Sequence, residues 1–445
     1  MGIPRNDETE TGLVSRSVRG SVPSLRAALD AMPAPRTFWT GPDEATVVAG
    51  GVAAAVTADG RDRFTSVRDD IDRLLRSGDV HAGTEAACPR LFGGFAFHDE
   101  ASDNNGTWAD FPGARFVLPR VQVTDTDRGT WVTVNAVGAD ATPEAVERRL
   151  EEARERLAAV EEAGPRRGSH IVSRTRTTPR ETWRESVAAA VDRIEDGDLR
   201  KVVLAQALAV TLDDPLSVPD VLADLGETYP DCYRFLVEPT AGLDRPSLLG
   251  ATPERLVSRH GRTVTTGALA GTTGRGDTPT EDDWLAAELL DDEKNAHEHD
   301  LVAETIREQL SPFASSVTAG GRRVRRLETV QHLFTPITAT LDHDTHVLEL
   351  VEALHPTPAV GGLPPERALA TIRETEPFDR GWYAAPVGWV DAAGNGSFAV
   401  AIRSALARET TATLFAGVGI VADSDPDREW DEVQLKYRPI LDELE

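Results

Sequence analysis

Short runs dominated by apolar residues recur through the first third of the chain, and polar turns separate them. The runs ATVVAGGVAAAV (45–56), FGGFAF (92–97) and TWVTVNAV (130–137) are rich in small, β-branched and aromatic residues, with Gly- and Asp-containing turns between them. Such runs predict β-strands. Residues 1–20 lack such a pattern, and we expect them to be disordered.

A helical period appears next and returns further along the chain. TPEAVERRLEEARERLAAVEEA predicts a helix over 142–163, which the following Gly-Pro ends. A second helix is expected over 178–197, and the polar segment 166–179 before it is expected to be an open connector. Apolar residues also recur at helical spacing over 281–310 and 426–444, which predicts one long helix and a closing helix.

Strands return in the C-terminal two thirds of the chain and are clustered. KVVLAQALAV (201–210) is apolar on both faces, as in a fully buried strand. Further strand-like runs lie at 233–239, 246–271, 386–391, 397–406 and 412–421. Because strands and helices are not strictly alternating, the pattern favours an α+β fold over a parallel doubly wound sheet.

The length of 445 residues allows either two or three domains or one large one. Hydrophobic residues make up 40% of the chain, which is enough for a sizeable core and excludes wholesale disorder. We find no membrane-spanning apolar run and no secretory signal, and we expect a cytoplasmic protein. Cys88 and Cys232 lie far apart without a partner motif, which favours a reducing compartment and argues against a zinc cluster.

The chain is strongly acidic, with a formal net charge of −27. Without a concentrated basic patch, such a chain repels nucleic acid and anionic membranes, so neither is expected as a partner. Only three bases are lysines, namely Lys201, Lys294 and Lys436. A surface of Arg, Asp and Glu is typical of a halophilic protein, although high genomic GC content also replaces Lys by Arg. Burial can turn a lysine into a base, whereas an arginine stays charged, so each lysine is a candidate for chemistry.

Three charged residues share one face of the closing helix. Glu429, Glu432 and Lys436 are spaced three and four apart, so their side chains project together. Two carboxylates at this spacing suit a hard cation such as Mg²⁺. A solvated, salt-bridged face explains the same spacing. The strand and turn before the helix contain Gly417 and Gly419, whose backbone N–H groups are available to an anion.

The long helix contains a second acidic candidate, Glu298. His297 and His299 flank it, but alternate residues of a helix diverge by about 200°, so the two imidazoles do not share one metal ion. Glu298 is interpreted either as a carboxylate metal ligand or as the partner of Lys294 four residues earlier.

Lys201 and Glu254 are the candidates for proton transfer. Lys201 begins an apolar strand, where burial lowers the pKa of an amine towards use as a general base. The alternative is a strand-end lysine whose ammonium reaches water. Glu254, in the turn GATPERL, is interpreted as a proton donor with a raised pKa or as a turn carboxylate paired with Arg255.

These residues belong to nine motifs that follow one another in a fixed order. The motifs are KVVLA with Lys201, GATPERL with Glu254, ALAGT (268–272), DEKNAHEHDLV (292–302), QHLFT with His332, LHPTPAVGG (354–362), AIRSA with Arg403, FAGVGIV (415–421) and EWDEVQLK (429–436). Together they resemble the chorismate-utilising enzymes, which include isochorismate synthase, salicylate synthase, anthranilate synthase component I and aminodeoxychorismate synthase component I.

The resemblance implies one large α+β domain over residues 21–445. It would consist of two packed antiparallel sheets with helices outside and the active site between the sheets. Residues 21–165 would form its less distinctive half, and residues 178–445 would carry the catalytic motifs. No obligatory protein partner is evident.

The subfamily follows from three positions. Lys201 occupies the place of the lysine in family members that use water, and Ala270 stands where a lysine nucleophile lies in some aminodeoxychorismate synthases. Ala359 replaces the threonine of the corresponding turn in anthranilate and salicylate synthases. The resemblance therefore favours an isochorismate synthase that supplies menaquinone synthesis. A siderophore route, a salicylate synthase and a catalytically silent chorismate-binding subunit are the alternatives.

For such an enzyme the resemblance implies Mg²⁺-dependent conversion of chorismate to isochorismate. Lys201 would activate the water that adds at C2, and Glu254 would protonate the hydroxyl that leaves C4. Glu298 and Glu432 would hold Mg²⁺, with Glu429 as a third carboxylate.

The same resemblance assigns the other walls of the site. Arg403, Tyr383 and Gly417 would bind the enolpyruvyl carboxylate, and Lys294 would order the helix that carries Glu298. The remaining expected substrate-binding residues are Gly271, His332, Ala359, Val360 and Lys436.

Overall fold

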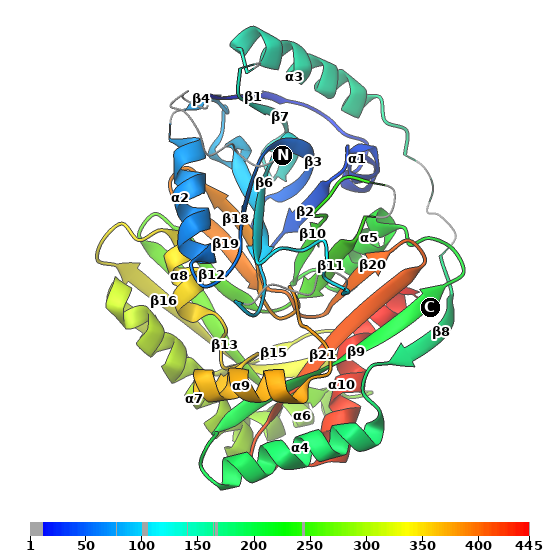
Figure 1. Ribbon diagram of the computed structural model, residues 1–445, viewed down its shortest axis with the longest axis vertical. Coiled ribbons are helices and arrows are strands. Elements are labelled where there is room, and N and C mark those ends of the chain that lie inside the picture. The colour runs from blue at the N-terminus through cyan, green and yellow to red at the C-terminus, as the bar shows by residue number, and fades with distance from the viewer. Residues whose placement is uncertain are drawn as a thin grey trace.

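Two long strands, β3 (Thr46–Ala58) and β6 (Ala114–Thr126), pair antiparallel and form the junction of the β-structure (Figure 1). β3 is rich in Val and Ala and β6 contains three Val residues, and many of these side chains are buried in the pleated surface. The computed structural model describes residues 12–76, 78–99, 106–139, 141–162, 164, 168–242 and 245–444. All strands of these residues connect to the β3–β6 pair through backbone hydrogen bonds.

One arm of the sheet, the first arm, extends from β3. Its strands pair antiparallel in the order β2 (Arg36–Thr40), β10 (Tyr233–Val237), β11 (Ser247–Thr252), β20 (Ser404–Arg408), β21 (Thr411–Ile420), β9 (Lys201–Leu212) and β8 (Ile171–Arg176). The two-residue strand β17 (Gly362–Leu363) pairs with the first residues of β9, including Lys201. This pairing brings the LHPTPAVGG turn beside Lys201.

The second arm extends from β6. Its strands pair in the order β5 (Arg90–Phe95), β18 (Pro386–Asp391), β19 (Gly396–Val400), β12 (Arg255–His260), β13 (Thr263–Gly274) and β16 (Val330–Leu341), with β14 (Ala314–Ala319) and β15 (Arg323–Arg326) both paired to β16. The two packed antiparallel sheets that the resemblance implies are present as two arms of one continuous sheet.

The N-terminal strands close the other end of the molecule. β7 (Gly129–Val137) pairs with β6 and with β1 (Leu13–Arg19), and β1 pairs in parallel with β4 (Gly78–His81). The expectation that residues 1–20 are disordered is therefore wrong for Leu13–Arg19, because this segment completes a sheet edge. Residues 1–11 lie outside the described residues.

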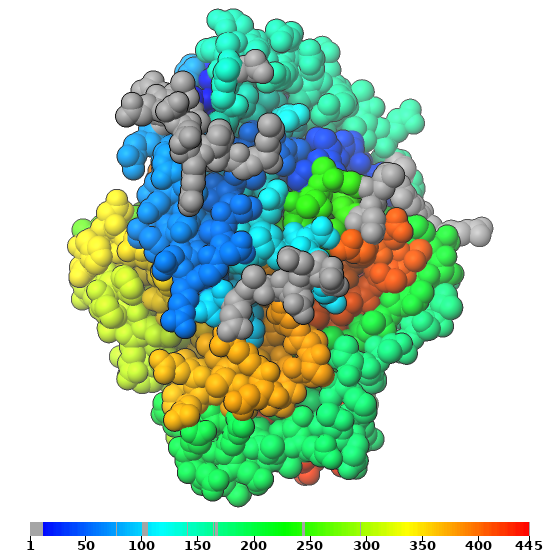
Figure 2. All heavy atoms as spheres, viewed as in Figure 1, coloured from blue at the N-terminus to red at the C-terminus, as the bar shows by residue number. Residues whose placement is uncertain are grey.

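Helices pack on both arms and on the N-terminal strands (Figure 1). They are α1 (Leu25–Ala31), α2 (Arg63–Leu75), α3 (Pro143–Ala158), α4 (Arg180–Glu195), α5 (Val218–Thr228), α6 (Pro279–Asp291), α7 (Glu293–Leu310), α8 (Val347–Leu354), α9 (Pro365–Thr375) and α10 (Pro426–Leu441), with short 3₁₀ turns η1 (Glu85–Ala87), η2 (Ser311–Phe313) and η3 (Asp442–Leu444). In the space-filling view, α9 lies between α2 and α4 on one face (Figure 2). α10 packs on β21, and α7 packs on β13 and β16.

A single hydrophobic core includes buried residues from Leu13 to Leu444. The predicted α+β class is confirmed, because helices and mostly antiparallel strands pack around this one core. None of the described helices combines the length and the apolar character that crossing a bilayer requires.

Three local predictions are corrected by the structure. The expected helix over 281–310 is two helices, because Asp292 takes an extended conformation and its side chain caps the start of α7 at Asn295 N–H. The expected connector over 166–179 contains β8, which pairs with β9. The helix expected over 142–163 ends at Ala158.

The strand expected over 397–406 is also interrupted. β19 ends at Val400 and β20 begins at Ser404, and Arg403 between them has a φ of 51°. A non-glycine residue in this left-handed region is strained, and such strain is concentrated at functional sites.

Candidate active site

The two arms enclose a pocket between β9 and β21 on one side and β13 and β16 on the other. All thirteen residues that the sequence predicts for the site line this one pocket: Lys201, Glu254, Gly271, Glu298, His332, Ala359, Val360, Tyr383, Arg403, Gly417, Glu429, Glu432 and Lys436. They come from strands, helices and turns spread over more than 230 residues. The pocket therefore combines the motifs that the sequence shows only as an ordered series.

Lys201 is buried at the start of β9, with 3% of its surface exposed. Its Nζ donates a hydrogen bond of 2.6 Å to Glu298 Oε1. The interpretation of Lys201 as a lysine that reaches water is therefore wrong. Glu298 projects from α7 towards this ammonium, and the side chain of Lys294, its other expected partner, lies outside the described residues.

Gly419 on β21 makes the approach of Lys201 and Glu298 possible. A Cβ atom at this position would lie 2.9 Å from Lys201 Cε and 3.3 Å from Glu298 Oε1. Any larger residue would push this pair away from the strand. Gly417, two residues earlier, has the same relation to Tyr383, since its Cβ would lie 3.2 Å from the Tyr383 hydroxyl.

Glu254 lies between β11 and β12 and is 6% exposed. Burial raises the pKa of this carboxyl group to about 7, although a hydrogen bond from Thr357 and the charges of Lys201, Lys436 and Arg403 oppose the increase. Thr357 Oγ1 donates to Glu254 Oε1 at 3.3 Å. The alternative that Glu254 pairs with Arg255 is wrong.

Helix α10 turns its charged face into the pocket rather than towards solvent. Lys436 Nζ lies 2.7 Å from Glu432 Oε1 and donates a hydrogen bond of 3.0 Å to the carbonyl of Gly417. Glu429 is buried on the same helix. The interpretation as a solvated, salt-bridged face is therefore wrong, although the predicted pair itself exists.

The three carboxylates of the predicted metal site share the pocket, and we asked whether they suit a cation. Glu298, Glu429 and Glu432 offer only hard oxygen donors, the kind that Mg²⁺ prefers. Within the described ranges, no three Asp, Glu, His or Cys side chains are close enough together to form a ready metal cluster. Glu298 and Glu432 each contact a lysine Nζ instead. The oxygen donors are of the kind that Mg²⁺ binds, but the three carboxylates do not surround one point.

Arg403 and Tyr383 form the opposite wall. Arg403 is 6% exposed, and burial lowers the pKa of its guanidinium. Among the described residues its guanidinium has no carboxylate partner, so it is available to an anionic ligand. The Tyr383 ring stacks on Phe415 at a centroid distance of 5.2 Å, and burial raises the pKa of its hydroxyl.

His332 and Gly271 close the pocket near α7. The His332 Nδ1 and Thr272 Oγ1 atoms form a hydrogen bond of 3.0 Å. Burial and the charge of Arg403 lower the pKa of His332 well below its ordinary value, so the imidazole is neutral. Gly271 has a φ of 75° and faces Asn295 of α7, where a Cβ atom would lie 3.1 Å from Asn295 Oδ1.

The histidines beside Glu298 behave as their spacing predicts. His297 is exposed, whereas His299 is fully buried and hydrogen-bonds with Thr335 Oγ1 at 2.8 Å. The two imidazoles therefore do not face one metal.

A buried ion pair that no sequence motif indicates supports two walls of the pocket. Arg380 donates to the carbonyl oxygens of Val203 and Val360, each at 2.8 Å, and forms an ion pair with Glu376. Glu376 in turn accepts a hydrogen bond of 2.8 Å from the backbone N–H of Ala205. The pair thus fixes β9 against the turn that contains Val360. Its only sequence signal is an acid and a base four residues apart.

Comparison with known proteins identifies relatives over nearly the whole chain. The family described as "Chorismate binding enzyme" matches residues 7–445. Isochorismate synthase MenF of Bacillus subtilis is 37% identical over 423 residues, which cover 92% of this chain and 88% of that protein. A salicylate biosynthesis isochorismate synthase of Pseudomonas aeruginosa is 37% identical over 94% of this chain and 86% of its own length.

The fold is shared with a solved structure. MenF, the menaquinone-specific isochorismate synthase from Escherichia coli, superposes with a TM-score of 0.81 and 25% identity, covering 98% of this chain and 95% of that one.

Proposed function

Since this chain belongs to the family of chorismate-binding enzymes, we propose that it is an isochorismate synthase that isomerises chorismate by adding water at C2 and releasing the C4 hydroxyl. The membership predicted from nine motifs is confirmed. The proposal is supported most strongly by one observation: all thirteen predicted site residues line one pocket in a chain whose relatives are isochorismate synthases over more than nine tenths of its length.

In this proposal Lys201 and Glu254 move the protons. Lys201 accepts a proton from the water that attacks C2, and Glu254 donates a proton to the hydroxyl that leaves C4 as water. A pKa of about 7 keeps a large fraction of Glu254 protonated at neutral pH, as a general acid requires. After turnover, Lys201 loses and Glu254 regains a proton through solvent.

Arg403 and Tyr383 would bind the enolpyruvyl carboxylate. A buried guanidinium without a carboxylate partner among the described residues matches this anion in charge and in bidentate geometry. The neutral imidazole of His332 and the small side chain of Ala359 would shape the wall around the ring.

We assign Mg²⁺ to Glu298 and Glu432, with Glu429 as a third ligand. When bound, the ion would neutralise and orient the ring carboxylate of the substrate. Glu298→Gln and Glu432→Gln should each weaken Mg²⁺ binding about tenfold or more, measured by calorimetry without substrate. Glu349→Gln, which lies outside the pocket, is the matched control. A Glu298 or Glu432 variant whose Mg²⁺ titration overlays that of wild type would remove that residue from the ligand set.

The decisive experiment resolves the products of chorismate turnover. Purified protein with chorismate and Mg²⁺ should form isochorismate, without pyruvate release, and added ammonia should not yield anthranilate. Salicylate with stoichiometric pyruvate would identify a salicylate synthase instead. No conversion by wild type, with chorismate still bound, would indicate a catalytically silent binding subunit.

We further propose that the product supplies menaquinone synthesis in the cytoplasm. The Escherichia coli structural relative is menaquinone-specific, although the Pseudomonas aeruginosa relative serves salicylate biosynthesis. Both cysteines are free thiols, which suits a reducing compartment. Deletion of the gene in its source organism should abolish menaquinone. A strain that keeps menaquinone and loses a catechol siderophore would contradict this assignment.

A further inference from the structure

Arginines near β15 divide into two groups by their partners. Arg322 pairs with Asp300 at 3.1 Å, and Arg326 pairs with Asp283 at 2.6 Å. Arg323, between them, has no carboxylate partner among the described residues, although acids outnumber bases by 74 to 47 in this chain.

Two further arginines share this lack of an acidic partner within the described part of the chain. Arg325 donates to two backbone carbonyls, those of Pro253 at 2.9 Å and Asp231 at 2.7 Å. Arg255 donates to the Tyr233 hydroxyl and to Thr265 Oγ1. Neutral acceptors satisfy the hydrogen bonds of these guanidinium groups but leave their positive charges uncompensated.

The unpaired arginines line one pocket, which we call the cationic pocket. It has a volume of about 460 Å³ and is lined by Pro42, Tyr233, Pro253, Glu254, Arg255, Thr266, Gly267, Leu269, Arg323, Val324, Arg325 and Phe334. The candidate active-site pocket between the two arms is called the catalytic pocket. Pro253, Glu254 and Leu269 line both pockets, so the two cavities adjoin at these three residues. Aromatic surface is present as well, because Arg323 lies over the Phe334 ring at 5.4 Å.

The charge of this pocket differs in sign from that of the whole molecule. The net charge of −27 repels an organic dianion on average. Three arginines around one concave surface reverse the potential locally, and concave, low-dielectric walls focus such a field. Glu254, the only acidic residue among the described residues of the lining, has a pKa raised to about 7 by burial and cancels the positive charge only in part.

We propose that the cationic pocket captures the dicarboxylate substrate beside the catalytic pocket, with Arg323 as a capture residue. This inference rests on the proposed function, since chorismate is the dianion in question. Arg323 is exposed and holds no backbone group, so it is free to bind a carboxylate in transit. Arg325, in contrast, donates to the carbonyl of Pro253 next to Glu254, so its substitution would also disturb the local structure.

The test compares Arg323→Gln with Arg322→Gln. The second variant removes the same charge one residue away, but from an arginine that is already paired with Asp300. Focused charge raises association rates about 10–1,000-fold. If the three arginines contribute equally to the free energy of attraction, each one accounts for about a two- to tenfold change in the association rate. Arg323→Gln should therefore lower kcat/KM for chorismate about two- to tenfold at 0.05 M KCl and leave kcat unchanged. The difference should vanish near 1 M KCl, where the Debye length is about 3 Å. Arg322→Gln should overlay wild type at both salt concentrations.

Association of chorismate without Mg²⁺, measured by surface plasmon resonance, separates this proposal from the proposed function. A reduced association rate in Arg323→Gln alone supports capture even if wild type yields no isochorismate. Equal kinetics for Arg322→Gln and Arg323→Gln would overturn the capture role. A loss in Arg323→Gln that persists at 1 M KCl would also contradict it, because screening should remove a purely electrostatic effect.

Discussion

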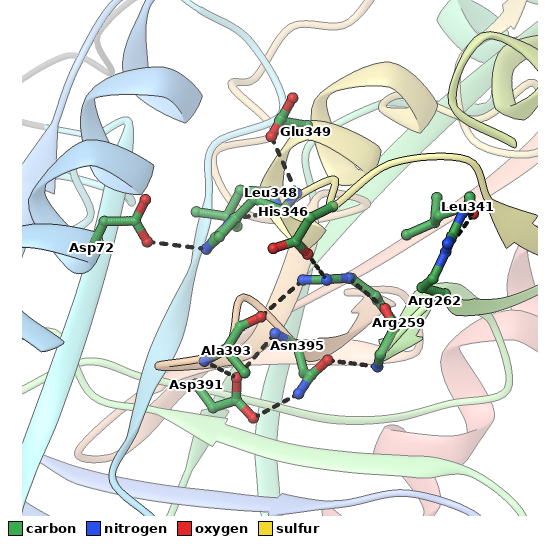
Figure 3. Close-up of polar contacts among 12 residues, drawn as sticks. Asp72, Arg259, Arg262, Leu341, His346, Leu348, Glu349, Asp391, Ala393 and Asn395 are labelled. Atoms are coloured by element: carbon green, nitrogen blue, oxygen red, sulfur yellow. Dashed lines mark hydrogen bonds and ion pairs between the residues drawn. The ribbon is translucent and has the colours of Figure 1, made fainter. Parts of the chain in front are cut away.

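Two buried polar clusters of this molecule differ in how fully their charged groups are hydrogen-bonded or paired. The first, which we call the anchor cluster, lies where β12, α8 and the β18–β19 turn meet (Figure 3). Arg259, which is 4% exposed, donates to the carbonyls of Gly261 and Ala393 at 2.9 and 3.0 Å and also to Asp344. His346 caps α8 by accepting from Leu348 N–H at 3.1 Å.

The catalytic pocket leaves its charged groups less completely matched. Glu254 is buried with one hydrogen bond of 3.3 Å from Thr357, and Arg403 has no acidic partner among the described residues. Burial accordingly shifts the pKa of Glu254 upward and that of Arg403 downward. The comparison shows that burial alone does not mark a functional site. A functional site is marked by buried charged or titratable groups that lack an ion-pair partner, because a ligand or a proton can then bind to them.

The largest expected effect is on catalysis by Lys201. Lys201→Ala should lower kcat about 10²–10⁴-fold while folding and chorismate binding persist, because the general base is missing. Lys201→Arg should be nearly as poor, since a guanidinium does not release its proton at neutral pH. Steady-state kinetics and circular dichroism provide the measurement. A variant that keeps more than a tenth of the wild-type kcat would exclude Lys201 as the base.

The next effect concerns the anchor cluster and should appear in stability alone. Arg259→Met removes two hydrogen bonds from a buried guanidinium to backbone carbonyls, which should cost about 1–3 kcal/mol of unfolding free energy. Chemical denaturation at pH 7 measures this loss. Arg262→Met is a milder control, because within the described part of the chain Arg262 donates to one carbonyl, that of Leu341. The kcat of folded Arg259→Met should equal that of wild type, and a large loss of kcat would show that the two clusters are coupled.

Glu254 should show the reverse pattern, with lost activity and increased stability. Its pKa rises from 4.5 to about 7 on folding, which corresponds to about 3 kcal/mol. The native state therefore binds more protons than the unfolded chain between these values, and wild-type stability falls as the pH rises through this window. Glu254→Gln should exceed wild type in unfolding free energy at pH 8, by up to that amount, and approach it near pH 4. The kcat of wild type should fall above pH 7. Equal unfolding free energies of wild type and Glu254→Gln at pH 8 would contradict the raised pKa of Glu254.

The smallest effect on either cluster is expected from salt, which acts mainly on the surface. Self-repulsion of a chain with net charge −27 should be screened between about 0.1 M and 2 M KCl, because the Debye length falls from about 10 Å to below about 3 Å. The melting temperature without ligands should rise by roughly five degrees or more if the protein is halophilic. Melting temperatures that agree within about two degrees would favour genomic GC content as the source of the arginine bias.

The sequence by itself determined the family and the α+β class, and it predicted thirteen residues that the fold places around one pocket. Local order carries this information, because a motif such as GATPERL or EWDEVQLK is a property of neighbouring residues. Gly419, which the approach of Lys201 to Glu298 requires, and Gly417, which lies against Tyr383, were also present in FAGVGIV. Helical spacing likewise placed Glu429, Glu432 and Lys436 on one face before any contact was known.

Only the tertiary structure decided which partner each of these groups has. Lys201 meets Glu298 across 97 residues of sequence, and Arg380 and Thr357 support the pocket without a motif that announces them. The helix break at Asp292 and the strand break at Arg403 were not predicted for a related reason. A continuous apolar pattern does not show where a side-chain cap or tertiary contacts end a helix or strand. Desolvation, which sets the pKa of Glu254, sums over all elements around the carboxyl group. It is therefore fixed by the packing of two sheet arms and not by the order of residues along either one.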